Sequence, residues 1–516
     1  MRELSAFAVF SWVVVYFPWL SSWAGIFWVT PGYYHNVDYY ASLAVWAVIA
    51  MVIVLLYWQM TVIMPRSGGD YVFISRTLTP LVGFVAGFLF FVAYVVSAGS
   101  GAYWAFGEAG SQMGFAGEVL KNSFMANLGS SMNPFGASPD RILMFGIGLV
   151  LLALGATTVL IGGRFLRGVI YFFFGYAFLT LLVVVGIFLS TSHAAFVGAY
   201  NNHASSFTAS VPDIFTQAAS KGYSPGPSLA NLSAVIPLLF VSIGPYPVMQ
   251  MVGGEIKNPR RSLLYGLVGA EILSIVIWFA LTYLFDRVVG ISFVEAWTIA
   301  PSAGGGYPPV PTIFTSVIAP NPFLAWFIFG GLFVSNIGWS WLGFVFVSRM
   351  VMSWSFDGLI PAKFADVSPR FHTPTFAVAL AAVVAIVPMY LEFFTSFIAT
   401  QVNSIFILGV IWILTSISAI VLPFRRRKIY ESSSEKLVIS GIPLVSILGA
   451  IGLAVFGYLA YYSITNPAVG PFSSGAQAFL GGILLAALGI YSVSQYYNKK
   501  KRGLDLSVIF NELPPE

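Results

Sequence analysis

Long apolar runs alternate with short polar connections along most of this chain. Each run is long enough for an α-helix that crosses the hydrocarbon core of a bilayer, which takes about 20 residues. We therefore predict an all-α polytopic membrane protein. The expected spans cover residues 4–29, 41–64, 81–106, 142–162, 168–190, 231–253, 263–285, 323–348, 375–392, 402–424, 438–463 and 477–497.

The polar connections are too short to hold a sizeable soluble domain. The longest lie at 107–141, 191–230 and 286–322. The first apolar run is too long for a signal peptide, and only Arg2 precedes it as a positive charge. We predict a ten-helix core over 1–424, two additional transmembrane helices over 438–497 and a short tail over 498–516.

Two of the predicted spans contain residues that interrupt an α-helix. The sixth carries Gly244, Pro245 and Pro247 in one turn, and each proline removes a backbone donor and clashes with a preceding carbonyl. The first carries Pro18, two serines and Gly25. Open backbone at membrane depth is tolerated where it is buried in protein or lines a polar cavity. The alternative is a pair of proline kinks without a ligand, which also occur in membrane helices.

The positions of the two breaks predict an inverted repeat. Each break lies in the first span of a group of five, and an odd number of spans makes the second group run opposite to the first. We predict a first repeat over 1–190 and a second over 231–424. Broken helices at matching positions of two halves are typical of a transporter binding site.

The composition agrees with a membrane protein and excludes several kinds of site. Hydrophobic residues make up 58% and charged residues 8%, against about a quarter charged in soluble domains. Without Cys there is no disulfide, thiol nucleophile or thiolate site. His35, His193, His203 and His372 are scattered over predicted loops, so we expect no metal site and no cofactor. A net charge of +5 does not indicate nucleic-acid binding.

Basic residues are distributed unevenly between the two sides of the predicted bundle. Of the 24 Lys and Arg, 20 fall on the side of the N-terminus; the other four are Lys121, Arg141, Lys221 and Arg287. Cytoplasmic loops carry the excess of basic residues in membrane proteins. We predict a multi-pass protein of the cell membrane with both termini cytoplasmic. Lipid-binding patches would explain the same clusters, but topology needs fewer assumptions.

Four short motifs follow one another along the chain. Residues 25–32 read GIFWVTPG, residues 65–71 read PRSGGDY, and EIKNPR follows Gly244 at 255–260. The fourth motif joins Arg349, Asp357, Gly358, Pro361, Thr373 and Pro374. In this order they resemble an amino acid permease of the amino acid–polyamine–organocation superfamily, over nearly the whole chain. The resemblance implies a leucine-transporter-type fold of ten core helices plus two, and secondary transport of amino acids or related amines.

The chain departs from that family at both breaks. Trp23 and Ala24 stand where the family's G-S-G-I-F pattern has glycine and serine, and Trp23 fills space. Gly244, Pro245 and Tyr246 replace the family's G-F-E, so the carboxylate of that motif is missing. These departures bear on the identity of the substrate.

The breaks offer backbone groups that suit a free amino acid. The N-terminus of a half-helix offers unpaired N–H groups and a positive dipole end to a carboxylate. The expected groups are the N–H donors of Ala24, Gly25 and Ile26, and carbonyls near Ser21, Val241 and Ser242 as acceptors for the ammonium. Gly25 and Gly244 are expected to serve backbone geometry. The alternative for Ser21, Ser22 and Ser242 is a hydroxyl bonded back to its own helix.

The resemblance also implies a side-chain pocket built from the third, sixth, eighth and tenth spans. The matching positions are Ala93, Tyr94, Ala98, Phe240, Ile243 and, less directly, Ser340 and Trp341. Phe240 falls where relatives keep an aromatic ring that covers the substrate. Ordinary helix packing is the alternative for all of them. Apolar and aromatic walls without an embedded acid favour a neutral substrate.

Charged residues near the cytoplasmic ends are candidates for gating or coupling. Acids inside a membrane are normally functional, and Glu271 is the one that the predicted spans place well inside. A pair with a nearby basic loop is its alternative. We expect two inner clusters, one of Glu255, Lys257 and Arg260 and one of Arg349, Asp357 and Arg370.

The coupling ion stays open between a proton, sodium and neither, as in exchange. The resemblance implies that some proton-coupled relatives carry a lysine in the fifth span, but residues 168–190 contain none. Ser335, Ser340 and Thr180 are candidate hydroxyls for a sodium site.

A secondary transporter of amino acids, with neutral ones favoured, is the first functional hypothesis. An exchanger of polyamines or cationic amino acids and a receptor of transporter fold are the alternatives, although the chain offers no sizeable output domain. A membrane enzyme is disfavoured because no nucleophile–base set or phosphate loop is found, and the glycine run at 304–306 lacks the P-loop pattern. The expected partners are a small-molecule substrate, a coupling ion and the lipid bilayer.

Overall fold

The computed structural model describes residues 3–205, 207–244, 247–300, 305–433, 436–503 and 506–514. In this part of the chain, eleven helical stretches are long and apolar enough to cross a membrane. The protein is thus an all-α polytopic membrane protein, as predicted. The stretches are α1 (Ala6–Tyr16) with α2 (Trp19–Tyr33), α3 (Tyr39–Ile63), α5 (Pro80–Val119), α7 (Arg141–Ile161), α8 (Gly163–Leu189), α12–η3–α13 (Pro259–Leu263, Leu264–Val268, Gly269–Val288), α16 (Pro322–Phe356), α17 (Thr375–Phe394), α19 (Ser404–Arg425), α21 (Leu444–Thr465) and α22 (Ser474–Tyr497) with η5 (Asn498–Arg502).

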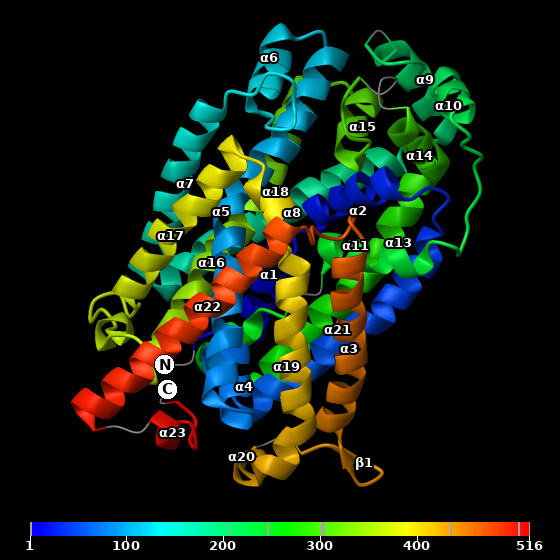
Figure 1. Cartoon of the computed structure of the whole chain (residues 1–516). Helices are drawn as coiled ribbons and strands as arrows, with labels where there is room; N and C mark the ends of the chain where they lie inside the picture. The colour runs from blue at the N-terminus through cyan, green and yellow to red at the C-terminus, as the bar shows by residue number, and fades with distance from the viewer. Residues whose placement is uncertain are drawn as a thin grey trace.

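The two longest helices, α5 and α16, pack against each other in the interior, and the other spans surround them (Figure 1). One end of the bundle, the loop end, carries the short helices α6 (Ser123–Met132), α9 (His193–His203), α10 (Val211–Ser220), α14 (Ile291–Ile299) and α15 (Pro311–Ile318). The opposite end, the terminal end, carries α4 (Asp70–Thr77), α20 (Arg427–Ser432), α23 (Leu506–Ile509) and both chain ends. The remaining short elements are η4 (Ala362–Ala365) and α18 (Phe397–Gln401).

Polar caps start the long helices at the positions where the chain leaves the loops. The Asp140 side chain accepts from the Leu143 N–H at the start of α7, and Asn403 does the same for Phe406 at the start of α19. Thr79 caps α5, whose first residue is Pro80. Such caps satisfy backbone donors that the first turn leaves unpaired, and proline at the first position costs no hydrogen bond.

Nine of the predicted spans correspond to continuous long helical stretches with shifts at their ends, the first is the broken pair α1 and α2, and two others differ in kind. The sixth span is the helix α11 (Leu232–Ile243) followed after its break by the 3-10 turns η1 (Met249–Met251) and η2 (Gly253–Glu255). The eleventh begins at Leu444, because residues 438–443 form the hairpin β1 (Val438–Ile439) and β2 (Ile442–Pro443). Ser440 and Gly441 have φ angles of +50° and +82°, which a tight hairpin turn requires and a helix excludes.

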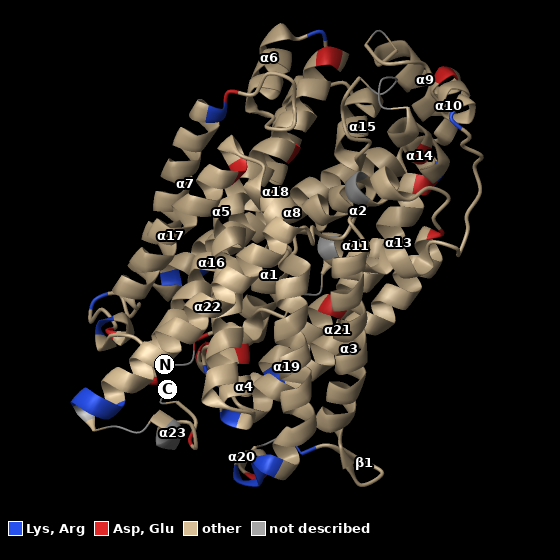
Figure 2. Ribbon diagram, in the orientation of Figure 1, with Lys and Arg blue, Asp and Glu red and all other residues tan. Residues whose placement is uncertain are grey.

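Charged residues lie mostly at the two ends of the bundle. Lys and Arg gather at the terminal end, around α20, the end of α22 and the chain ends, whereas few lie at the loop end (Figure 2). The connections predicted at 107–141, 191–230 and 286–322 all belong to the loop end and contain α6, α9, α10, α14 and α15.

Candidate functional site

The first break separates α1 from α2 at Phe17 and Pro18. The Phe17 N–H still bonds to the Val13 carbonyl, and the Ser22 N–H bonds to the Pro18 carbonyl, each at 2.9 Å. Helix geometry therefore leaves the N–H groups of Trp19, Leu20 and Ser21 without an acceptor inside α2. The last carbonyls of α1 likewise have no N–H donor within that helix, apart from the carbonyl of Val13, which accepts from Phe17.

This position corrects the donors expected from the sequence. Ala24, Gly25 and Ile26 lie inside α2, where their N–H groups face carbonyls four residues back, and the Ser21 carbonyl is one of those acceptors. The physical reason is that the helix is interrupted at Pro18, which has no backbone N–H, whereas Gly25 continues it. The free donors lie five residues earlier than predicted.

The second break begins where α11 ends at Ile243. Gly244 has φ +69° and ψ −157°, a region that is essentially restricted to glycine. Its carbonyl accepts a 2.7 Å hydrogen bond from the Trp46 indole of α3. The carbonyls of Val241 and Ser242 belong to the last turn of α11 and have no acceptor role inside it, so their predicted role as acceptors for an ammonium stays a prediction.

The two broken spans contact each other through α2 and α11. The Ser242 hydroxyl donates to the Leu238 carbonyl at 3.0 Å and lies 3.4 Å from the Gly25 carbonyl. A Cβ at Gly25 would lie 3.6 Å from the Ser242 Cβ, an ordinary contact distance. Ser242 therefore bonds back to its helix, as the alternative predicted, while it also marks where the spans meet. Ser22 is buried nearby.

The predicted pocket side chains of the third and sixth spans lie on α5 and α11. Tyr94 of α5 stacks on Phe90 and lies 6.1 Å, ring to ring, from Tyr16 at the end of α1. Phe240 of α11 packs edge-on against Trp412 of α19. Ala93, Ala98 and Ile243 are buried.

Other predicted pocket residues lie elsewhere or outside the description. Trp23 packs against Phe188 of α8 and Phe285 of α13, and Trp341 packs against Phe173 of α8. The Ser340 hydroxyl bonds to the Ala98 carbonyl at 2.6 Å and so joins α16 to α5. Tyr246 and the side chain of Val241 lie outside the described residues.

A small cavity of about 10 Å³ adjoins the first break and is lined in part by Val14, Pro18 and Ser335. A volume of this size holds about one water molecule. Ser335 donates to the Gly331 carbonyl at 2.7 Å, and Thr180 donates to the Tyr176 carbonyl at 2.9 Å. Both hydroxyl protons are thus used within their own helices, which leaves the oxygen lone pairs as the groups available to a cation.

Several acids lie within the helical bundle, and the sequence predicted only Glu271 among them. Glu271 is buried, and its Oε1 has no hydrogen-bond partner among the described residues, so the expected pair with a basic loop is not found there. The sequence placed Glu271 alone well inside a span, and this was wrong, because α5 continues to Val119 and includes Glu108. Glu392 of α17 accepts from Ser100, and Asp70 is fully buried at the start of α4. The apolar run ends near residue 106, and this is why Glu108 read as a loop residue.

Glu108 connects the first broken span to two other helices. One carboxylate oxygen, Oε2, accepts from the Ser21 hydroxyl at 2.5 Å and from the Asn336 amide at 2.9 Å. Ser21 lies in the first turn of α2, and Asn336 lies on α16. An acid therefore adjoins the free donors of the first break.

Asp70 connects the second break to the rest of the bundle. It accepts hydrogen bonds from Tyr57 of α3 at 2.5 Å, Thr415 of α19 at 2.6 Å and Gln250 of η1 at 2.9 Å. Gln250 also donates to the Pro247 carbonyl at 2.7 Å. The sequence had marked Asp70 only as a position within a motif.

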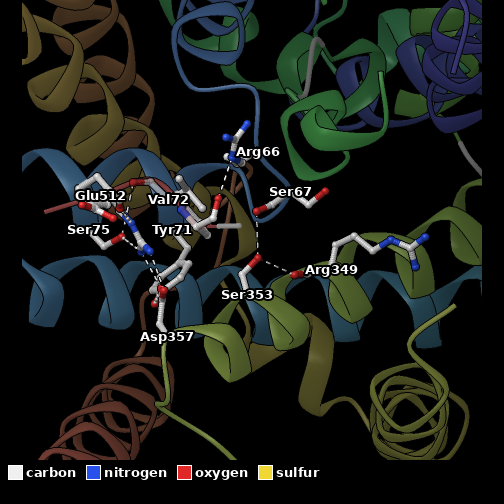
Figure 3. A network of polar contacts seen from close by, with 11 residues as sticks. Arg66, Ser67, Tyr71, Val72, Ser75, Arg349, Ser353, Asp357 and Glu512 are labelled. Atoms are coloured by element: carbon white, nitrogen blue, oxygen red, sulfur yellow. Dashed lines mark hydrogen bonds and ion pairs between the residues drawn. The ribbon is translucent and has the colours of Figure 1, made fainter. Parts of the chain in front are cut away.

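Two of the ion pairs at the terminal end involve residues of the predicted inner clusters, in other combinations than predicted. Arg349 pairs with Glu255 at 2.6 Å, and Asp357 pairs with Arg76 through two bonds of 2.6 Å, both partners being fully buried. Tyr71 also donates to Asp357, and Ser353 joins the Ser67 and Arg349 carbonyls (Figure 3). Each pair connects segments about 100 residues or more apart in the chain, which spacing within one motif cannot reveal.

The remaining members of the predicted inner clusters have other contacts. Lys257 is exposed, and its backbone N–H bonds to the Leu4 carbonyl. The Arg260 carbonyl accepts from the Trp58 indole at 3.1 Å. Arg370 stacks on the ring of Phe371.

The C-terminal tail packs against the same face. The Arg66 Nε donates to the Pro514 carbonyl at 2.7 Å, and the Arg76 Nε donates to the Glu512 carbonyl at 3.2 Å (Figure 3). The Phe510 ring covers the Arg76 guanidinium at 4.7 Å. The described part of the tail is thus bound to the bundle.

A second polar cluster joins the loops at the loop end. Glu295 of α14 accepts from the Val37 N–H at 3.1 Å and from the Tyr223 hydroxyl at 2.8 Å. Burial lowers the pKa of His35 and raises the pKa of Tyr223. The neutral forms of His35 and Tyr223 are therefore favoured. We interpret this cluster as one that holds the loops together.

Comparisons with known proteins agree with this architecture. A family model described as amino acid permease matches residues 4–488. The branched-chain amino acid permease BcaP of Lactococcus lactis subsp. cremoris (strain MG1363) is 21% identical over 364 residues, which cover 66% of this chain and 65% of BcaP. The match therefore spans slightly less than two thirds of that relative.

Proposed function

Because this chain belongs to the amino acid permease family, we propose that it is a secondary active transporter of neutral amino acids that works by alternating access. The observation that carries the proposal is the contact of the two broken spans at Gly25 and Ser242, one helical turn along α2 from the free N–H of Ser21. The free N–H groups at the start of α2 suit a carboxylate, and the last carbonyls of α11 suit an ammonium. We therefore place the carboxylate of a zwitterion at the start of α2 and its ammonium at the end of α11.

The side chains around the breaks support a neutral, apolar substrate. Phe240, Ile243, Ala93 and Ala98 are buried and apolar. The partial relative is named as a branched-chain amino acid permease, which is consistent with an aliphatic side chain in this pocket. We propose leucine, isoleucine and valine as the first substrates to test.

Uptake of labelled leucine into proteoliposomes tests the function. We expect uptake above that of empty liposomes and competition by isoleucine and valine, but not by arginine or a polyamine. Leucinamide should compete weakly because it lacks the carboxylate that α2 would bind. Competition by arginine and polyamines alone would support the cationic exchanger instead. Leucine binding without uptake or exchange would support the receptor.

The charge distribution supports a membrane orientation with both termini cytoplasmic. Basic residues gather at the terminal end (Figure 2), and such residues are retained on the cytoplasmic side. Single cysteines at Ser130 and Ser205 should react with an impermeant thiol reagent added outside intact cells. A cysteine at Ser433 should react only after permeabilisation, and labelling of Ser433 in intact cells contradicts the orientation.

A further inference from the structure

The proposed binding of the substrate uses backbone groups of α2 and α11 and leaves the carboxylate of Glu108 without a role. This carboxylate bonds through one oxygen to Ser21 and Asn336, at 2.5 and 2.9 Å. Asn336 also lies 3.3 Å from the Ser21 hydroxyl and donates to the Leu332 carbonyl at 3.1 Å, so the three side chains form one closed cluster. Ser21 and Asn336 are buried, and Glu108 keeps part of its surface accessible.

Hydroxyl and amide groups hold this acid, and no cation among the described residues pairs with it. The described α2, α6 and α15 carry no Asp, Glu, Lys, Arg or His, and the basic residue of α16 lies 13 positions beyond Asn336. Other charged and titratable groups lie on the elements packed around α5 and on α5 itself. They are Tyr16 of α1, Tyr33 of α2, Asp70, Tyr71 and Arg76 of α4, Tyr94, Tyr103 and Glu118 of α5, Arg141 of α7, Arg349 of α16, Tyr390 and Glu392 of α17, Arg425 of α19, Tyr491, Tyr496 and Tyr497 of α22, and Tyr307 before α15.

We propose that Glu108 is the proton-carrying group of this transporter, so that an amino acid and a proton bind together. The inference rests on the proposed function, because it takes the substrate carboxylate to lie at the first turn of α2. Ser21 belongs to that turn, and its side chain contacts Glu108. Two carboxylates held this close do not both stay ionised in a buried site.

The direction of the coupling follows from these charges. In the empty site the anion of Glu108 is stabilised by two donors and by the positive end of the α2 dipole. When the substrate carboxylate takes that dipole end, Glu108 gains a proton and turns neutral. The proton leaves again when the substrate does, and one proton accompanies each amino acid.

A cationic substrate is the competing use of an unpaired acid. The structure favours a proton over a substrate cation as the partner of Glu108. Both hydrogen bonds to its Oε2 come from Ser21 and Asn336, which lie beside the turn of α2 proposed to bind the substrate carboxylate. The acceptors for an ammonium lie instead at the end of α11. A substrate cation at Glu108 would leave the free donors of α2 facing no anion.

Binding to the purified wild-type protein gives the first test. We expect leucine to bind more tightly as the pH falls, approaching a tenfold change in Kd per pH unit for strict one-to-one coupling. Leucinamide has an ammonium but no carboxylate, so it should bind no better, or less tightly, at low pH. Equal pH dependence for the two ligands overturns the proposal. If neither leucine nor any other amino acid binds at any pH, the proposed function itself has failed.

Transport by Glu108→Gln gives the second test, with Glu392→Gln as the matched control. Glu392 also contacts a serine of α5 and has no substrate role here. We expect E108Q to exchange leucine across the membrane, yet to lose accumulation driven by an inside-alkaline pH gradient. E392Q should keep that accumulation. Gradient-driven accumulation by E108Q overturns the proposal, as does a loss confined to cationic substrates. Should E108Q not fold, the wild-type binding comparison decides.

Discussion

The breaks in the first and sixth spans interrupt the membrane helix by different means. In the first, Pro18 separates two helices, α1 and α2, and the interruption covers only Phe17 and Pro18. In the sixth, Gly244 ends α11 with a positive φ, and among the described residues the next α-helix begins at Pro259, after two 3-10 turns. The first break is therefore confined to Pro18 and its neighbour Phe17, whereas the second extends from Gly244 to Asn258.

The difference shows which parts of each break depend on the rest of the molecule. The first needs only the missing N–H and the fixed φ of proline. The second is bound from outside, because Trp46 holds the Gly244 carbonyl and Asp70 holds Gln250. Substitution of the residue that makes the break should therefore act more strongly at Gly244 than at Pro18, and the following experiments test this difference and the contacts around each break.

Gly244→Ala should have the largest effect. An L-residue at φ +69° and ψ −157° is strained by about 1–3 kcal/mol, which corresponds to roughly fivefold to a hundredfold in leucine affinity. Gly32→Ala is the control, since a Cβ there meets nothing within 4 Å. Leucine Kd measured on both purified variants checks the comparison. An unchanged Kd for G244A would show that this backbone is not part of the site.

Pro18→Ala should have the next largest effect. Alanine restores an N–H and favours a helix over proline by about 3 kcal/mol, so α1 and α2 would tend to join. We expect roughly tenfold slower leucine transport, with a protein at least as heat-stable as the parent. Pro322→Ala serves as control because that proline occupies the first turn of α16. Transport by P18A at the parental rate would mean that the first break does not bind substrate.

Trp46→Phe should have an intermediate effect. It removes the indole donor to the Gly244 carbonyl and keeps most of the ring volume. A lost hydrogen bond of about 1 kcal/mol corresponds to roughly fivefold in affinity. Trp278→Phe is matched, because its buried indole N–H has no partner among the described residues. Equal leucine Kd values for the two variants would indicate that Trp46 does not support the second break.

Gly25→Ala should have the smallest effect. The new Cβ would lie 3.6 Å from Ser242, and alanine favours a helix over glycine by about 0.5–1 kcal/mol. Leucine Kd should stay within about twofold, and the melting temperature should rise slightly. Gly25→Val adds branches toward α11 and should weaken binding more. A tenfold loss with alanine alone would place Gly25 at the substrate rather than at the helix contact.

The sequence alone predicted the features that depend on long stretches of residues. Apolar runs placed the spans, since covering a bilayer takes about 20 residues wherever they lie in the fold. Pro18 and Gly244 marked the two broken spans, because a proline ring and a missing Cβ act on the backbone directly. Spacing of motifs identified the permease family, which the match over residues 4–488 confirms. The binding and gating roles of individual residues stay predictions.

Only the tertiary structure determined which polar groups meet. Glu108 read as a loop residue, since its helix continues beyond the apolar run that predicted it, and its partners Ser21 and Asn336 lie 87 and 228 positions away. The Arg76–Asp357 pair and the three donors around Asp70 likewise join distant helices. Hydropathy and local propensity depend on neighbours along the chain, whereas a buried hydrogen bond depends on which helices pack together. For that reason the sequence located the breaks, and the fold determined what surrounds them.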